Sequence, residues 1–127
     1  MLTSPTPAWF EIPTADLSRA RSFYENLFGK DLKLQTMGPM KMAIFPSEGA
    51  EQTGALVECE GYEPATTGSV LYLEVDDVRS TLKRLCASGG ESLFPVTALP
   101  DDGGFFAQFR DSEGNRVGIY SKTSAAA

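Results

Sequence analysis

The chain has 127 residues, 42% of them hydrophobic, and carries 17 acidic against 11 basic side chains, for a net charge of −6. This length and apolar content suit one compact domain, and the acidic balance argues against nucleic acid or an anionic membrane as a partner. Histidine is absent, which excludes Ser-His-Asp and Cys-His catalysis and any zinc site with histidine ligands.

The first half of the chain has the pattern of a strand, a helix and three more strands. An extended segment from Trp9 to Thr14 leads to Asp16, a good helix N-cap. Apolar residues continue at helical spacing to Phe28, and Gly29 ends the helix. Three strands are predicted next, at about 32–37, 41–45 and 54–58.

The second half repeats this order. A strand at 70–75 leads to Asp77, which caps a helix that Gly89 and Gly90 close. Three strands follow, joined at the end by a turn in which Gly114 and Asn115 suit the left-handed conformation; the predicted ranges are 92–99, 104–110 and 116–121.

The repeat predicts the fold class. Asp77 lies 61 residues after Asp16, and the flanking apolar positions coincide at the same offset. We therefore predict an α+β fold in which two βαβββ modules, each with one helix, form a cupped mixed sheet. A single domain results, with modules at about 8–60 and 69–121 and a short tail at 122–127.

The cysteines and the N-terminal residues indicate the cellular compartment in which the protein is expected. Cys59 and Cys86 fit neither a disulfide framework nor a metal motif, and Cys86 is predicted to be a small core residue of the second helix. No apolar run is long enough to span a bilayer, and the first residues lack the pattern of a signal peptide. A cytoplasmic location is expected.

Four segments carry recognisable motifs at the opening and the close of the chain: 9–13, 16–20, 23–29 and 109–117, with Ser112 where proline is common. Together they resemble the vicinal oxygen chelate superfamily of glyoxalases, bleomycin-resistance proteins and dioxygenases. The shorter motifs 40–46, 61–62, 103–107 and 117–119 resemble a bacterial subfamily of predicted enzymes related to lactoylglutathione lyase. The resemblance covers about residues 8–121 and implies a glyoxalase-like fold, but this superfamily has many different activities.

The resemblance also locates four positions at which relatives carry metal ligands. Three of them hold Trp9, Val70 and Gly118, and the fourth falls within 55–57, close to Glu58. Indole, valine and glycine side chains donate no lone pair to a divalent cation, and one carboxylate would not hold it alone. The expectation is a protein with neither a bound metal nor a cofactor.

Two carboxylates are candidates for catalysis instead. Strand alternation places Glu11 and Glu74 on faces that should line the cleft, where burial or a like-charged neighbour would raise a carboxyl pKa toward that of a general base. The alternative is that both are solvated at the rim or paired with Arg110 or Arg116.

The predicted cleft lining is rich in aromatic and methionine side chains. Alternation and the resemblance together select Trp9, Met40, Met42, Tyr72, Phe106 and Tyr120, with Glu11, Gln108 and Arg110 as polar points. Such a lining suits a flat or apolar small molecule.

A filled core is the alternative to an open cleft. In that case these side chains, Trp9 above all, would fill the space between the sheets and leave no room for a ligand. The glycine at position 118 indicates that either a ligand or Trp9 approaches the strand at 116–121 closely. Loops at 49–53 and 61–67 are candidate lids.

Three functions remain open at this point. The first is a metal-independent binder of small molecules, expected to be a homodimer because relatives commonly are. The second is a glyoxalase-like lyase or isomerase in which Glu11 or Glu74 is the base and Arg110, Gln108 or a backbone N–H stabilises the enolate. The third is a structural dimer without a pocket. Whether the chain is an enzyme is left open.

Overall fold

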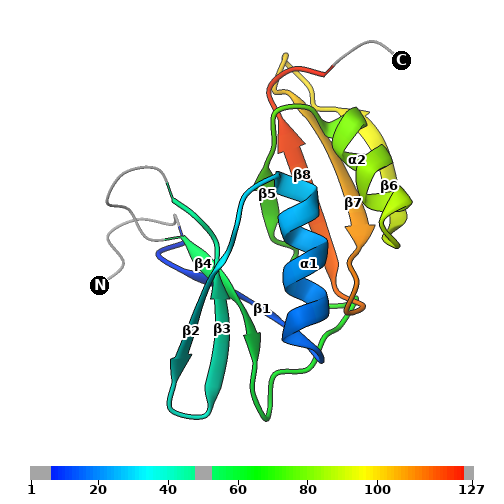
Figure 1. Ribbon diagram of the computed structural model, residues 1–127. Helices are drawn as coiled ribbons and strands as arrows, with labels where there is room; N and C mark the ends of the chain where they lie inside the picture. The colour runs from blue at the N-terminus through cyan, green and yellow to red at the C-terminus, as the bar shows by residue number, and fades with distance from the viewer. Residues whose placement is uncertain (1–6, 48–52, 125–127) are drawn as a thin grey trace.

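The computed structural model describes residues 7–47 and 53–124. Figure 1 shows its elements, which follow one another as β1 (Phe10–Pro13), α1 (Leu17–Phe28), β2 (Lys33–Met37), β3 (Met40–Ile44), β4 (Gly54–Glu58), β5 (Tyr72–Glu74), α2 (Val78–Ala87), β6 (Glu91–Ala98), β7 (Phe105–Arg110) and β8 (Arg116–Ser121). The predicted α+β fold of two βαβββ modules is confirmed. The strand predicted at 70–75 is shorter than expected, because only Tyr72–Glu74 are registered opposite β8.

The helix ends follow the predicted capping residues. The Asp16 carboxylate accepts a hydrogen bond from the Arg19 N–H at 3.1 Å, and Gly29 adopts a left-handed φ of 66°. Asp77 caps α2 in the same way. Cys86 was expected in the core and is instead exposed, because α2 buries the side of the helix that carries Val78, Thr81 and Leu85.

The strands form two four-stranded sheets, one from each half of the chain. We call the sheet with strand order β1-β4-β3-β2 sheet A and the sheet with strand order β5-β8-β7-β6 sheet B. The first strand of each module runs parallel to the last strand of that module, and the other neighbours are antiparallel. β1 and β5 are therefore edge strands in the part of the chain that the structure describes.

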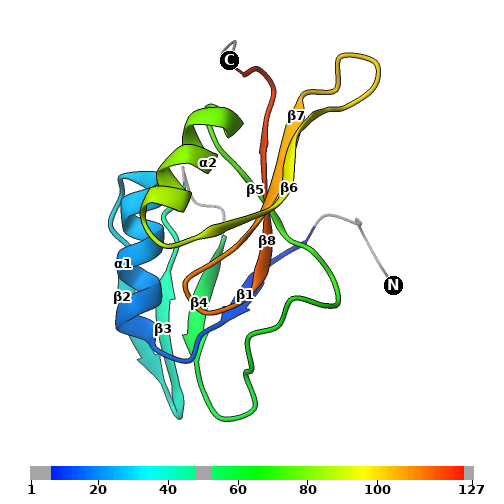
Figure 2. The same ribbon diagram turned by 90° about the vertical axis from the view of Figure 1, so that its right-hand side faces the viewer.

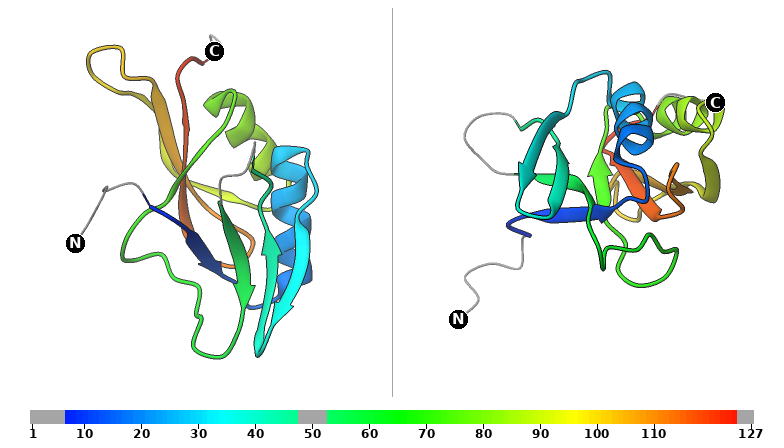
Figure 3. Two further views of the ribbon diagram at one scale, coloured as in Figure 1. Left: turned by 90° about the vertical axis from the view of Figure 1, so that its left-hand side faces the viewer. Right: turned by 60° about the horizontal axis from the view of Figure 1, so that its bottom comes forward.

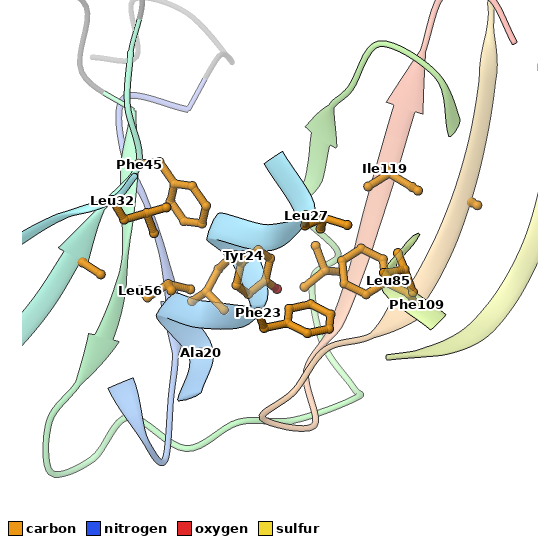
Figure 4. Packing of buried hydrophobic residues seen from close by; sticks show 14 of the residues in the cluster. Ala20, Phe23, Tyr24, Leu27, Leu32, Phe45, Leu56, Leu85, Phe109 and Ile119 are labelled. Atoms are coloured by element: carbon orange, nitrogen blue, oxygen red, sulfur yellow. The ribbon is translucent and has the colours of Figure 1, made fainter. Parts of the chain in front are cut away.

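One hydrophobic core joins the two sheets, with α1 between them. Figure 2 shows both helices on one side of the molecule and the long β4–β5 connection on the other, and Figure 3 shows sheet A and sheet B on either side of α1. Helix α1 buries Ala20, Phe23, Tyr24 and Leu27. In Figure 4 these side chains meet sheet A residues such as Leu56 and sheet B residues such as Ile119. Both sheets thus turn their helix-covered faces toward one another.

A buried polar network lies at the centre of this core. The Tyr24 hydroxyl donates to the Asp111 carboxylate at 2.6 Å, and burial, followed by the charge of Asp111, raises the pKa of Tyr24 well above its usual range. Asp111 also accepts hydrogen bonds from the backbone N–H groups of Glu113 and Asn115. Helix α1 is thereby tied to the turn between β7 and β8.

In the β7–β8 turn, the backbone conformation of Asn115 differs from the prediction. Gly114 has a positive φ of 97°, whereas Asn115 does not adopt the left-handed conformation predicted for it. Its side chain is buried instead and donates to the Pro13 carbonyl at 2.8 Å and to Asp111 at 3.1 Å. Asn115 therefore links the end of β1 to the β7–β8 turn.

Glu113 makes a second link between the modules. Its carboxylate accepts hydrogen bonds from the N–H groups of Ala15 and Asp16, at 2.9 and 2.8 Å, and pairs with the Arg19 guanidinium at 2.7 Å. Burial by itself would raise the pKa of Glu113, but the hydrogen bonds from Arg19, Asp16 and Ser112 and the charge of Arg19 outweigh it and lower that pKa. The ionised carboxylate therefore stabilises the start of α1.

The stability that Glu113 contributes should depend on pH. Because the pKa of Glu113 is lower in the folded chain than its ordinary 4.5, the contribution is complete above that value and is lost as the pH falls through the folded pKa. We expect E113Q to be less stable than the unchanged protein by about 1–2 kcal/mol near neutral pH, and the difference to shrink below about pH 4. Urea unfolding at a series of pH values measures this. E91Q, which removes the exposed ion pair with Arg110, is the control, and a pH-independent difference for E113Q would contradict the assignment.

Candidate functional site

Each sheet has one face that points away from the shared core. The face of sheet A, called here the A face, carries Trp9, Glu11, Met40, Met42, Ile44, Ala55 and Val57. The face of sheet B, called the B face, carries Tyr72, Glu74, Phe94, Phe106, Gln108, Arg110, Arg116, Gly118 and Tyr120. All the residues predicted to line a cleft lie on these two faces. They are divided between two faces of the chain because the sheets pack through their helix-covered sides.

The A face is largely covered by its own side chains. Met42, Ala55 and Val57 are buried beneath Trp9 and Tyr62, which are partly buried themselves. Tyr62, from the β4–β5 connection, reaches the A face through long-range contacts that no local sequence pattern indicates.

Glu11 lies at the edge of this covering as a hydrogen-bond acceptor. The Tyr62 hydroxyl donates to one carboxylate oxygen of Glu11 at 2.8 Å, and the Trp9 indole N–H donates to the other at 3.3 Å. The hydrogen bond to Glu11 is the main reason why the pKa of Tyr62 is raised, followed by burial and the charge of Glu11. Both oxygens of Glu11 are thus engaged by neighbours on the A face.

The B face holds an open aromatic cavity. It has a volume of about 320 Å³ and is lined by Tyr72, Leu99, Phe106 and Tyr120. The Phe106 ring is stacked on Phe94 at a centroid distance of 5.3 Å and meets Tyr72 edge-on at 6.0 Å. Tyr72 and Phe94 each leave 42% of their surface exposed, which is a large apolar exposure for aromatic side chains. This cavity can hold a flat apolar molecule.

The sequence did not predict two apolar residues of this surface, one that lines the cavity and one that stacks on Phe106. Phe94 and Leu99 lie in or just after β6, where the register against β7 shifts between Ser92 and Phe94 and again between Phe94 and Thr97. Strand alternation fails across such irregularities, so a period of two cannot assign their faces. The only local signal was the apolar character of the segment.

The Tyr72 ring lies directly over Gly118. A Cβ added at Gly118 would come within 2.2 Å of the Tyr72 Cδ2 atom, far inside van der Waals contact. The predicted close approach at Gly118 is therefore made by Tyr72, and Trp9 lies on the other face of the chain. A larger side chain at position 118 would have to displace Tyr72.

The polar residues of the B face form a defined set of contacts. The Arg116 guanidinium donates to the side-chain amide oxygen of Gln108 at 2.7 Å and to the backbone carbonyl of Thr66 at 3.1 Å. Gln108 in turn donates to the Tyr72 hydroxyl at 2.6 Å. Arg110 pairs with Glu91 at 3.2 Å, so neither arginine is the partner of Glu11 or Glu74 considered from the sequence.

Of the two loops predicted as candidate lids, the structure describes only the second in full. Residues 49–52 of the first lie outside the described residues. In the second, Ala65 exchanges hydrogen bonds with the Arg116 N–H and the Asn115 side chain, both at 3.1 Å, and Tyr62 binds Glu11. This loop is therefore anchored at several points along its length.

The carboxylates considered as metal ligands or bases are spread over different surfaces. Glu58 faces the helix side of sheet A, where it accepts the Leu17 N–H at 2.9 Å and lies 3.8 Å from Lys41. Glu11 lies on the A face, and Glu74 is exposed on the B face. Across residues 7–47 and 53–124, no group of three or more Cys, Asp or Glu side chains is placed to hold a metal ion.

A larger cavity lies between the two modules. It has a volume of about 510 Å³ and an apolar floor that includes Phe10, Phe28 and Val75. Its lining also carries charges of both signs, such as Lys30 and Asp76. Within the described ranges, no helix is both long enough and apolar enough to cross a membrane.

Comparisons with known proteins agree with this architecture. Residues 6–119 match the family model of the Glyoxalase/Bleomycin resistance protein/Dioxygenase superfamily. A glyoxylase-like domain-containing protein from Didymella fabae is 30% identical over 115 residues, covering 88% of this chain and 90% of that protein.

Solved structures show the same fold. Glyoxalase I from Zea mays has a TM-score of 0.67 at 19% identity, and the alignment covers 91% of this chain but only 45% of the maize chain. TnmS3, an antibiotic binding protein from Streptomyces sp. CB03234, also has a TM-score of 0.67, at 23% identity, over 97% of this chain and 100% of its own. From the family match and the shared fold, we conclude that the chain belongs to the Glyoxalase/Bleomycin resistance protein/Dioxygenase superfamily.

Proposed function

We propose that the protein binds a small, flat, largely apolar molecule between the B face of one protomer and the A face of a second protomer, without a metal ion. The observation that carries this proposal is the open cavity lined by Tyr72, Leu99, Phe106 and Tyr120. Aromatic side chains that remain exposed on a monomer lose water-exposed apolar surface when a ligand or a partner covers them. The name of TnmS3, an antibiotic binding protein, is consistent with a binding role for this fold.

The side chains at the metal positions of the family do not fit a divalent ion. The Trp9 indole N–H is a donor and is directed to Glu11, and Val70 has no polar atom. Gly118 has no side chain, and the Tyr72 ring covers it. Glu58, the nearest carboxylate to the fourth position, accepts the Leu17 N–H at the start of α1, on the opposite side of sheet A. A cation needs several converging oxygen, nitrogen or sulfur atoms, and these residues do not supply them.

A second copy of the chain would complete the site. The A face and the B face lie on the sides of their sheets that are opposite the common core, so each covers a ligand from one side only. The edge strands β1 and β5 leave backbone hydrogen-bonding groups available for pairing with another sheet edge. This chain spans only 45% of maize glyoxalase I, so that protein has room for a second unit of this size in one polypeptide. We therefore propose a homodimer in which β1 of one protomer lies beside β5 of the other.

The lyase or isomerase alternative has less support. Glu11 already accepts hydrogen bonds from Trp9 and Tyr62, and Glu74 is exposed on the B face. Because several relatives are named as glyoxalases, a lyase or isomerase activity is the second candidate function. A cytoplasmic location stays a prediction from the sequence.

Binding at the B face should depend on Phe106. We expect a neutral aromatic dye, N-phenyl-1-naphthylamine, to increase in fluorescence with the protein, and F106A to weaken its binding roughly tenfold because stacking and burial are lost. A neutral dye avoids repulsion from the net charge of −6. L34A is the matched control, because Leu34 is a large apolar residue 54% exposed on β2, outside both faces. Equal losses in F106A and L34A, or no dye binding, would contradict the proposed site.

A site shared between protomers should be recovered by mixing variants. W9A changes the A face and F106A changes the B face, so each homodimer would have two damaged sites. A mixed dimer would have one site with both changes and one with neither. Refolding the variants together should therefore restore about one quarter of the normal sites, by random pairing. Dye titration and sedimentation measure site number and mass, and an absence of recovery would show that the two faces do not share a ligand.

Metal ions should not bind stoichiometrically. After equilibration with Zn²⁺, Ni²⁺ or Mn²⁺ and dialysis, elemental analysis should find less than about 0.1 ion per chain. A site occupied at a hundredfold excess over its dissociation constant would stabilise the fold by about 2.7 kcal/mol, so the unfolding temperature serves as a second measurement. One tightly held ion per chain, with a matching rise in stability, would refute the metal-independent proposal.

A further inference from the structure

Three polar side chains form a continuous hydrogen-bonded series along the B face. The Arg116 Nη1 atom lies 2.7 Å from the Gln108 Oε1 atom, and the Gln108 Nε2 atom lies 2.6 Å from the Tyr72 hydroxyl. Gln108 pairs with Gly118 across the sheet, and Gly118 pairs with Tyr72. The series thus runs across three neighbouring strands and ends at the aromatic cavity that Tyr72 lines.

The direction of these hydrogen bonds is determined by chemistry. Arginine has five N–H donors and no acceptor, so the Gln108 group that faces Arg116 must be the amide oxygen. The amide NH₂ group of Gln108 must then face Tyr72 and donate to its hydroxyl oxygen. An exchange of the amide oxygen and nitrogen would set two donors against each other at Arg116.

The Tyr72 hydroxyl is consequently left with a proton that it can donate to a ligand. Its oxygen accepts the Gln108 N–H, so its own proton cannot be directed back to Gln108. Among the described residues, no acceptor for that proton is recorded. The positive charge of Arg116 polarises the amide, and the polarised amide makes the Tyr72 hydroxyl a better donor, because hydrogen bonds in series strengthen one another.

From this series we infer that Tyr72 is a specificity-determining residue, which selects aromatic molecules that carry an acceptor oxygen, such as aromatic ketones. This inference rests on the proposed function and names the ligand class for the same site. Phe106 and Tyr120 supply the apolar contact that any flat aromatic molecule can make. The Tyr72 hydroxyl distinguishes among such molecules, since a ligand without an acceptor would cover the hydroxyl and leave its proton unpaired.

A matched pair of ligands tests this preference. Fluorene and 9-fluorenone have the same planar three-ring outline and differ by one carbonyl oxygen. We expect the protein to bind 9-fluorenone about fivefold to tenfold more tightly, as one additional hydrogen bond would give. Displacement of N-phenyl-1-naphthylamine measures both affinities under one condition, and their ratio cancels any general change in apolar contact.

Two variants remove the donor in different ways. In Q108E the new carboxylate accepts hydrogen bonds from both Arg116 and Tyr72, so the Tyr72 proton turns away from the cavity. In Y72F the hydroxyl is absent. Each variant should reduce the ratio of the two affinities to about one. Because both positions lie on an open sheet face, neither change creates a cavity in the core.

The outcomes separate this inference from the proposed function. Equal binding of fluorene and 9-fluorenone by the unchanged protein would overturn the role of Tyr72 and leave the binding site standing. An unchanged preference in Q108E and Y72F would also overturn it. If neither compound nor the dye binds, the proposed function fails and the inference fails with it. A preference that both variants abolish supports the inference.

Discussion

The packing of α1 between the two sheets is the constraint on which the rest of the structure depends. A helix that buries Ala20, Phe23, Tyr24 and Leu27 has apolar contacts on more than one side, and here it meets sheet A and sheet B at once. The hydrogen bond from Tyr24 to Asp111 fixes this helix to the β7–β8 turn at the centre of the core. Both sheets must then direct their helix-covered sides inward, and their other faces outward. The residues predicted from the sequence to line one cleft are divided between the A face and the B face for that reason.

The aromatic surface of the B face is arranged around Gly118. Gly118 removes a side chain at the centre of the sheet, and the ring of Tyr72 occupies the space above it. Phe106 and Phe94 extend the aromatic surface through ring contacts. Arg116 donates to the side-chain amide of Gln108, which in turn donates to the Tyr72 hydroxyl. A surface of this kind can recognise shape through its rings and one polar atom through its hydroxyl.

The two open faces of this chain carry polar groups of different kinds. Similarity at 19% to 23% identity shows a common fold with maize glyoxalase I and TnmS3, and the fold does not determine the reaction. On the A face, Glu11 accepts hydrogen bonds from Trp9 and Tyr62, so that face offers an anionic acceptor. On the B face, the Tyr72 hydroxyl offers a donor. If the two faces come together in a dimer, they present complementary polar groups at either side of an apolar space.

The sequence by itself determined the secondary structure, because capping and alternation are local. Asp16, Gly29 and Asp77 predicted the helix ends, and the β4 and β8 ranges match the predictions. Local patterns failed where a distant contact decides the outcome. Asn115 was expected to be left-handed, but its side chain binds Pro13, and Cys86 was expected in the core but faces outward. Register shifts in β6 concealed Phe94, and Tyr62 meets Glu11 across 51 residues. Tertiary structure alone divided the predicted lining between two faces, because the common core of α1 and both sheets sets which face of each sheet stays open.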